Sequence, residues 1–379
     1  MSTPLSAPDA GTNPDAQGAT SDALGTVPGA LSRAAIARVD STGQLEDVLA
    51  LPEHLRDALW RVESAIMQDW DTSAGLVVAG MGGSAIGGAL ARAALGDHAS
   101  RPIFVTRAYG LPPWTTPDTM VLCASYSGET EETLACYESA GALGARRMVV
   151  TTGGRLAEMA RADGVPVIPL PGGFQPRAAV AYMTVTALEV AALCGAGPRL
   201  TSEIDVAASH TEQLVAEWGP DAPEDSLAKT LARGLQGTIP VVMGAGLTTP
   251  IAYRWKTQIN ENAKLPCFSH ELPELDHNEL VGWEGARELD PPARFAAVFL
   301  DDSDAHPRVK ERMALTERLI APSAAASFHL ETRGETTIER VISLVLLGDL
   351  VSIYLATLRG VDPGPVELID ELKAALAAS

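Results

Sequence analysis

From about residue 75 onward, short runs of apolar and β-branched residues alternate with longer stretches of helical periodicity. A short apolar run between turn residues predicts a buried strand, and its regular alternation with helices is typical of a parallel sheet covered on both faces. The pattern therefore predicts an α/β fold with parallel sheets. The predicted strands are residues 75–80, 102–108, 119–125, 145–152 and 165–170 in the first half of the chain, and 238–246, 294–302 and 326–332 in the second half.

The helical stretches between these runs predict the same architecture. In the first half, residues 84–96 and 129–144 each end on the glycine expected just past a helix C-terminus. The strands at 75–80 and 238–246 both lead into a glycine turn that precedes a helix. We therefore interpret the two halves as two copies of one doubly wound, three-layer α/β/α unit. The helical stretches of the second half are residues 249–265, 306–321 and 336–359.

Composition places the domain boundaries and the compartment. The polar segment EWGPDAPEDS at residues 217–226 interrupts the alternation and is the best candidate for a linker between a first domain, residues 41–216, and a second, residues 227–379. Residues 1–40 begin with small polar residues, and this composition predicts a disordered tail. The same stretch has neither the basic region nor the apolar region of a signal peptide. The four cysteines are far apart in sequence and form no CxxC pair, so we expect a cytoplasmic protein without structural disulfides or zinc.

Net charge narrows the classes of partner. The formal net charge is −20, which disfavours nucleic acid and anionic membranes because long-range repulsion opposes contact. A small anionic substrate is still compatible, since backbone amides can make one pocket locally positive. The most apolar stretch, residues 341–358, carries Asp349 and suits a buried helix better than a membrane span.

Two strand-to-helix turns in the first half predict an anion site. The turn AGMGGSAIGG, residues 79–88, offers Gly83 and Ser84, and the stretch ASYSGETEETL, residues 124–134, offers three hydroxyls. A turn of this kind presents unpaired N–H groups and the positive end of a helix dipole. Neither turn has the spacing of a dinucleotide fingerprint, a P-loop or a GxSxG elbow. The three hydroxyls are those of Ser125, Ser127 and Thr130. Each turn alone is compatible with an ordinary helix cap, and together the two turns favour a phosphate site.

With these turns in view, the chain resembles the sugar isomerase (SIS) domain and, in the order of its motifs, the bifunctional phosphoglucose/phosphomannose isomerase family. The motifs are GMGGSAIGG, SYSGETEETL, FQPRAAVAYM, NENAK followed by HELPELDHNE, and the C-terminal DPGPVELIDELKAAL. The resemblance covers the chain from about residue 45 to its end. It implies two SIS domains that isomerise a hexose 6-phosphate, whose phosphate is held by Gly83, Ser84, Ser125, Ser127 and Thr130.

The resemblance also implies a catalytic set. Isomerising an aldose phosphate to a ketose phosphate requires ring opening, proton transfer between C1 and C2, and stabilisation of an enediolate, and these tasks need no metal or redox cofactor. By resemblance, Glu261 is the proton-transfer base, His277 the ring-opening acid/base, and Arg177 the enediolate-stabilising cation. Lys373 matches a C-terminal lysine that contacts the sugar. The resemblance further implies a homodimer in which His277 of one subunit reaches the site of its partner.

Alternative interpretations remain for several of these residues. Glu261 and Lys264 have the spacing of a solvated i,i+3 ion pair, Lys373 has the spacing of a solvent-facing residue on an amphipathic helix, and Arg177 is compatible with a structural ion pair. His270 and His277 form a weak candidate for a metal site, since HELPE is not HExxH. At the level of function, the alternative is a noncatalytic SIS protein that binds a sugar phosphate.

One position departs from the family's pattern. Glu129 follows the SYSG glycine where the family usually has Asn. An acidic residue in the first turn stabilises a helix through the helix dipole, but a carboxylate close to a bound phosphate would repel it.

Overall fold

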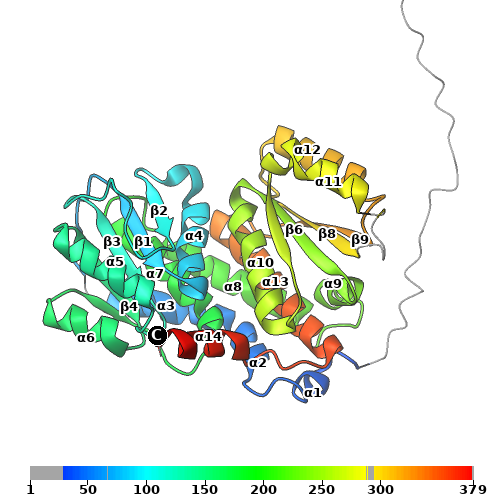
Figure 1. Ribbon diagram of the computed structural model, residues 1–379, viewed down its shortest axis with the longest axis horizontal. Coiled ribbons are helices and arrows are strands. Elements are labelled where there is room, and N and C mark those ends of the chain that lie inside the picture. Colours follow the sequence, from blue (N-terminus) through cyan, green and yellow to red (C-terminus); the bar gives the residue numbers. More distant parts are fainter. Residues whose placement is uncertain (1–28, 66, 287, 289–293, 378–379) are drawn as a thin grey trace, which may run out of the picture.

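The computed structural model describes residues 29–65, 67–286, 288 and 294–377. Two parallel sheets lie side by side (Figure 1), and each is the centre of one α/β unit. The α/β class and the pairing of two similar units are thus confirmed. The first sheet has the order β2 (Ile103–Thr106), β1 (Leu76–Gly80), β3 (Met120–Ala124), β4 (Arg146–Thr151) and β5 (Val167–Pro169); the second has the order β7 (Phe268–Leu272), β6 (Ile239–Ala245), β8 (Phe295–Asp301) and β9 (Ala326–Glu331).

Helices cover both faces of each sheet, which makes each unit a three-layer sandwich. Because successive strand residues point to opposite faces, Val77 packs under the outer helices whereas Val78 packs under the inner ones. The outer helices are α5 (Glu131–Ala142) and α6 (Gly154–Ala162) on the first sheet, and α11 (Glu279–Gly285) and α12 (Pro307–Ile320) on the second. The inner helices are α3 (Leu51–Ser64), α4 (Gly82–Leu95), α7 (Val180–Leu193), α8 (Thr201–Trp218), α9 (Leu227–Leu235), α10 (Thr249–Ala263) and α13 (Thr337–Arg359).

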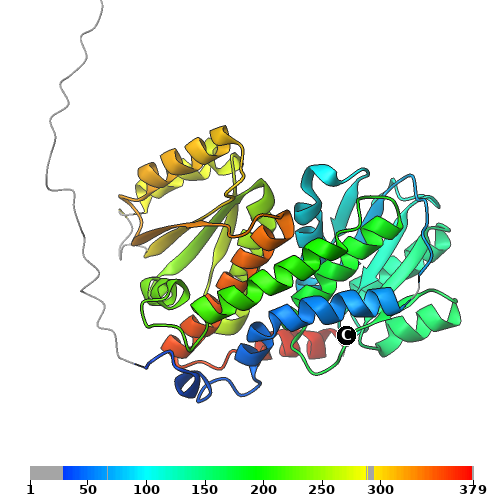
Figure 2. The same cartoon turned by 180° about the vertical axis from the view of Figure 1, so that it is seen from behind.

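The inner helices form one central layer that belongs to both sheets. Figures 1 and 2 show α8 and α13 crossing the middle of the molecule. A single apolar cluster runs through this layer, and it joins Val78 and Leu122 of the first sheet to Val242 and Val298 of the second. The two units therefore share a core instead of meeting across a solvated interface.

The helix α13 is the centre of this layer. Thr336 and Glu339 form a capping box at its start, and Gly360 ends it in the left-handed conformation. It is long and apolar enough to cross a membrane, but 89% of its most apolar window is buried within the protein. Asp349, on this helix, forms an ion pair with Arg254 of α10 at 2.6 Å. The prediction of a buried helix is confirmed.

Three details differ from the sequence predictions. The tail is predicted to reach residue 40, but Leu31 is buried and α1 (Arg33–Ile36) is folded, while residues 1–28 lie outside the described part. The helix α2 (Gln44–Leu49) follows within the predicted first domain. The expected linker begins inside α8, and its loop is fixed because the buried Lys229 Nζ donates to Pro220 O and Ala222 O. The strand β7 lies between the predicted helix at residues 249–265 and the predicted strand at residues 294–302, where the sequence pattern predicts no strand.

Candidate active site

The two predicted anion-binding turns meet at one edge of the first sheet. Their strands β1 and β3 are neighbours in register, with Gly80 opposite Ala124. The backbone N–H of Tyr126 donates to Ser84 Oγ at 3.2 Å, which ties the second turn to the first. The N-termini of α4 and α5 follow directly, so two helix dipoles direct their positive ends to this edge.

The second turn is shaped by its own hydroxyls. Ser125 is buried, its Oγ accepts from the backbone N–H of Gly128 at 3.0 Å, and it lies 2.9 Å from the hydroxyl oxygen of Thr130. Ser127 is exposed, and its Oγ accepts from the backbone N–H of Glu129 at 3.2 Å. These contacts hold the loop in a fixed conformation directly before the N-terminus of α5, and such an N-terminus favours a bound anion.

The carboxylate of Glu129 is hydrogen-bonded to a helix that follows this loop. Its Oε1 accepts a hydrogen bond from the backbone N–H of Arg155 at 2.8 Å, in the first turn of α6. The first residue of α5 is Glu131, and Thr130 is its N-cap, so Glu129 lies before that helix. The carboxylate therefore satisfies an otherwise unpaired donor of α6 instead of stabilising α5, as the sequence suggested.

Arg177 connects the predicted phosphate loops to the second unit. It lies in η3 (Pro176–Ala179), where a Cβ on Gly83 would approach Pro176 O to 2.7 Å and Arg177 Cα to 3.1 Å. Only a glycine at position 83 allows this close approach. The Arg177 side chain is buried, and its Nη1 lies 3.5 Å from Glu261 Oε2. Burial lowers the pKa of this guanidinium, while the charge of Glu261 acts in the opposite direction.

Glu261 is half-buried in the last turn of α10, where 28% of its side chain is exposed. Lys264 does not pair with its carboxylate, since Lys264 Nζ donates to the backbone carbonyl of Glu261 and, at 3.3 Å, to Pro363 O. Burial and the charge of Arg177 lower the pKa of Lys264. The carboxylate of Glu261 faces Arg177, so the interpretation of Glu261 and Lys264 as a solvated i,i+3 ion pair is wrong.

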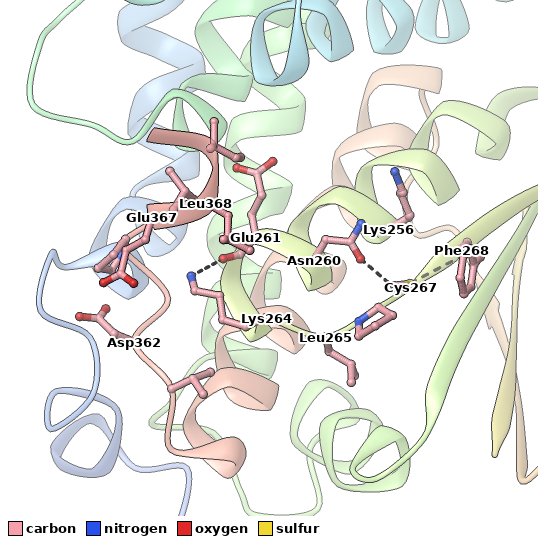
Figure 3. Close-up of a pocket in the computed structure, with 15 residues that line it drawn as sticks. Lys256, Asn260, Glu261, Lys264, Leu265, Cys267, Phe268, Asp362, Glu367 and Leu368 are labelled. Carbon is pink, nitrogen blue, oxygen red and sulfur yellow. Dashed lines mark hydrogen bonds between the residues drawn. The ribbon is translucent and has the colours of Figure 1, made fainter. Parts of the chain in front are cut away.

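A pocket of about 930 Å³ opens beside Glu261, between the end of α10 and α14 (Glu367–Ala377). Figure 3 shows Glu261 extending from α10 towards the segment that carries Leu368. None of the five residues predicted to bind phosphate lines this pocket. Its lining is largely apolar, with Leu265, Pro266, Cys267, Phe268, Val361, Pro365, Val366, Leu368 and Ile369.

Lys373 lies further along α14 and is exposed. It does not line the pocket, although the first turn of its helix does. The structure therefore brings the helix of Lys373 to Glu261, but not the lysine itself.

His277 is remote from Glu261 within one chain. Glu261 lines the same pocket as Phe268, the first residue of β7, whereas His277 lies in η5 (Glu274–His277), just after β7 ends. Five strand residues separate them by about 15 Å along the strand direction. His277 is exposed, and His270 pairs with Glu279 at 2.6 Å. Among the described residues, no group of three or more His, Cys, Asp or Glu side chains is arranged to hold a metal ion.

Sequence reasoning missed one buried contact of this site. Asn262 Oδ1 accepts from Arg177 Nε at 2.6 Å, and Asn262 is 1% exposed. The signal was present in NENAK, where a polar residue sits next to the candidate base, but the sequence gives no partner for it.

The paired parallel sheets and the hydroxyl-lined loops at a helix N-terminus define a SIS-domain protein of the sugar isomerase class. Residues 224–376 match the family model described as the bacterial phospho-glucose isomerase C-terminal SIS domain. The fold matches the crystal structure of a glucose-6-phosphate isomerase like protein from Thermus thermophilus, with a TM-score of 0.59, 20% identity, and coverage of 90% of this chain and 98% of that one.

Curated relatives narrow the class to one family. The chain is 40% identical to a bifunctional phosphoglucose/phosphomannose isomerase of Caldicellulosiruptor bescii, over 80% of this chain and 89% of that protein. It is 36% identical to the protein of the same name from Aquifex aeolicus, over 82% of this chain and 93% of that one. The chain belongs to the bifunctional phosphoglucose/phosphomannose isomerase family.

Proposed function

We propose that this protein is an isomerase that interconverts fructose 6-phosphate with glucose 6-phosphate, mannose 6-phosphate or both through an enediolate. The names of its relatives support this reaction. The observation that carries the proposal is the position of Arg177, whose backbone packs on Gly83 of the phosphate loop while its guanidinium faces Glu261. One residue thus links the anion site to a carboxylate. No finding favours the noncatalytic alternative.

Each side chain has a task in this proposal. The hydroxyls and amides of the two loops hold the phosphate. Glu261 removes a proton from C1 of the ketose as the C1–C2 double bond forms, and a proton passes from O1 to O2 of the intermediate. The proton on Glu261 exchanges with solvent, and the carboxyl group then protonates C2 to give the aldose. Arg177 Nη1 stabilises the negative charge that develops on the enediolate oxygen. The substrate is both oxidised and reduced within itself, so these steps need no redox cofactor.

We further propose that the active form is a homodimer in which His277 of one subunit completes the site of the other and opens the sugar ring. Two observations support this arrangement: β7 keeps His277 and Glu261 apart within one chain, and the pocket beside Glu261 exposes apolar side chains. Phe268 is 48% exposed and Leu368 is 81% exposed. A surface of this kind suits a protein partner better than solvent. Lys373 would approach the sugar from α14.

Isotope exchange tests the proposed base. Wild-type protein with fructose 6-phosphate and EDTA in D₂O should yield aldose 6-phosphate that carries deuterium at C2. Glu261→Gln should lower kcat by about 10²- to 10⁴-fold and leave sugar-phosphate binding, measured by calorimetry, intact. Wild-type turnover by Glu261→Gln would remove the proposed base. The ratio of glucose to mannose product defines the epimer preference.

Subunit complementation tests the shared site. Glu261→Gln and His277→Ala proteins are each nearly inactive in this proposal, and they are then co-refolded in equal amounts. If His277 acts across the interface, half of the dimers are mixed and each has one intact site, so about a quarter of wild-type activity should return. If His277 acts within its own chain, no intact site forms and the mixture stays inactive. That result would overturn the dimeric arrangement.

A further inference from the structure

A chain of buried polar contacts surrounds Arg177 where η3, α10 and α13 meet. Arg254, on α10, is 1% exposed, and its Nη2 donates both to Arg177 O at 3.1 Å and to Asp349 Oδ2 at 2.6 Å. Arg254 Nε also donates to Asp349 Oδ1 at 3.0 Å. The backbone of Arg177 is thus fixed by a buried, bidentate ion pair of the second unit.

A second branch fixes the guanidinium of Arg177. Arg177 Nε donates to Asn262 Oδ1 at 2.6 Å, and Asn262 Nδ2 donates to Ser352 Oγ at 2.8 Å. The hydroxyl proton of Ser352 is used in turn, because Ser352 Oγ donates to Asp349 O at 2.7 Å. Ser352 can therefore only accept from the amide. This directs the amide oxygen of Asn262 towards Arg177 and determines which way the amide is oriented.

The remaining donors of Arg177 can be counted. A guanidinium has five N–H groups in a planar fork. Nε is used by Asn262, and Nη2 donates to Pro363 O at 2.5 Å and to Gly364 O at 2.8 Å. Of the three nitrogens, only Nη1 is not used by these contacts, and it lies 3.5 Å from Glu261 Oε2.

We propose that Asn262 and Ser352 are positioning residues that orient the Arg177 guanidinium so that Nη1 is held ready for the reacting oxygen. This inference rests on the proposed role of Arg177. The pattern of contacts favours it over simple packing, because buried polar groups stabilise a fold no better than well-packed apolar residues of the same volume. What the contacts of Asn262 and Ser352 provide is a fixed orientation. A rotated guanidinium would leave Nε or Nη2 without an acceptor and would move Nη1 away from Glu261.

Helix α13 provides a matched pair of serines for the test. Ser352 and Ser343 are both fully buried, and each donates to the carbonyl three residues earlier on the helix. Each also accepts one N–H donor, which is the Asn262 amide for Ser352 and the backbone of Arg333 for Ser343. The two alanine variants remove the same chemistry from the same helix, but only one of them touches the Arg177 contacts.

The experiment measures kcat and KM for fructose 6-phosphate, together with the urea midpoint of unfolding. Ser352→Ala should lower kcat by about 5- to 50-fold with KM changed less than about twofold, because only the interaction with the transition state loses its alignment. Ser343→Ala should have a similar urea midpoint to Ser352→Ala and the kcat of the wild type. Equal kcat for the two variants would overturn the inference.

A second variant covers the case in which Ser352→Ala fails to fold. Asn262→Asp keeps the volume of the side chain and an acceptor for Arg177 Nε, but it has no N–H to donate to Ser352. Its carboxylate pairs with the guanidinium in competition with the enediolate, so kcat should fall by about 10-fold or more. Wild-type kcat in Asn262→Asp would also overturn the inference. An active wild type with unaffected variants refutes only this inference, whereas an inactive wild type, or a fully active Glu261→Gln, refutes the proposed function.

Discussion

Replacing Gly83 by alanine tests whether the contact between the phosphate loop and Arg177 matters for turnover. The added Cβ would lie 2.7 Å from Pro176 O and 3.0 Å from Pro176 C, both backbone atoms that cannot rotate away. The approach is about 0.7 Å shorter than the 3.4 Å at which ordinary contacts begin, so either α4 or η3 has to move by this amount. Such overpacking costs about 1–3 kcal/mol of unfolding free energy.

The kinetic effect should exceed what this loss of stability explains. A displacement of η3 moves Arg177 relative to Glu261, and a misplacement of about 1 Å costs on the order of 10²-fold in rate. We expect Gly83→Ala to lower kcat/KM by about 10- to 100-fold, measured by coupled initial rates at a temperature where the variant is folded by circular dichroism.

Gly96, at the other end of α4, provides the control. It has a φ of +47° with nothing near its missing Cβ, so Gly96→Ala should cost about 1–2 kcal/mol of stability through backbone strain and leave kcat/KM unchanged. If Gly83→Ala is as active as Gly96→Ala, the contact between the phosphate loop and Arg177 has no role in catalysis.

Two further predictions concern charged side chains. Glu129→Ala should lower the free energy of unfolding by about 0.5–1 kcal/mol through loss of the cap on α6, and it should leave KM for fructose 6-phosphate unchanged; a large decrease in KM would show that this carboxylate repels the phosphate. The hydrogen bond with Asp301 raises the pKa of His329 from 6.5 to about 9, so protonated His329 stabilises the folded state below the unfolded pKa, and this contribution is lost as pH rises through the folded value. Because 33% of the His329 side chain is exposed, solvent screening weakens this contribution, and wild type should be more stable than His329→Gln by about 1 kcal/mol in urea titrations near pH 6. The difference should disappear near pH 10. A difference that is independent of pH would contradict the role given to protonated His329.

The strands with continuous apolar runs could be predicted, whereas the edge strand could not. β1 and β3 are buried at every residue, so the apolar run is the whole signal. In β7 only Leu272 is buried, and Phe268 and Glu271 are exposed. Its hydrogen bonds to β6 are made by the backbone, which leaves no trace in the side-chain pattern. An edge strand of this kind is therefore read as a loop.

The site was partly predictable for a similar reason. Glycine and hydroxyl turns after adjacent strands meet at the carboxyl ends of those strands, so local pattern alone predicts that the two turns lie together, as the structure has them. The contacts of Arg177 could not, because Arg254, Gln258 and Asn262 repeat every four residues along α10. This spacing normally marks a solvent-facing stripe, yet all three are buried against α13. The identity of the opposing face is a tertiary fact that periodicity does not contain.

The central helical layer has a consequence for how this enzyme could be divided or moved. Since α8, α10 and α13 belong to one continuous core, a fragment that ends in the loop before α9 would expose a large apolar surface and should aggregate. The same continuity removes the hinge on which two-lobed enzymes usually close over their ligands. Pre-alignment of the catalytic groups would then be achieved once, during folding, instead of at every turnover.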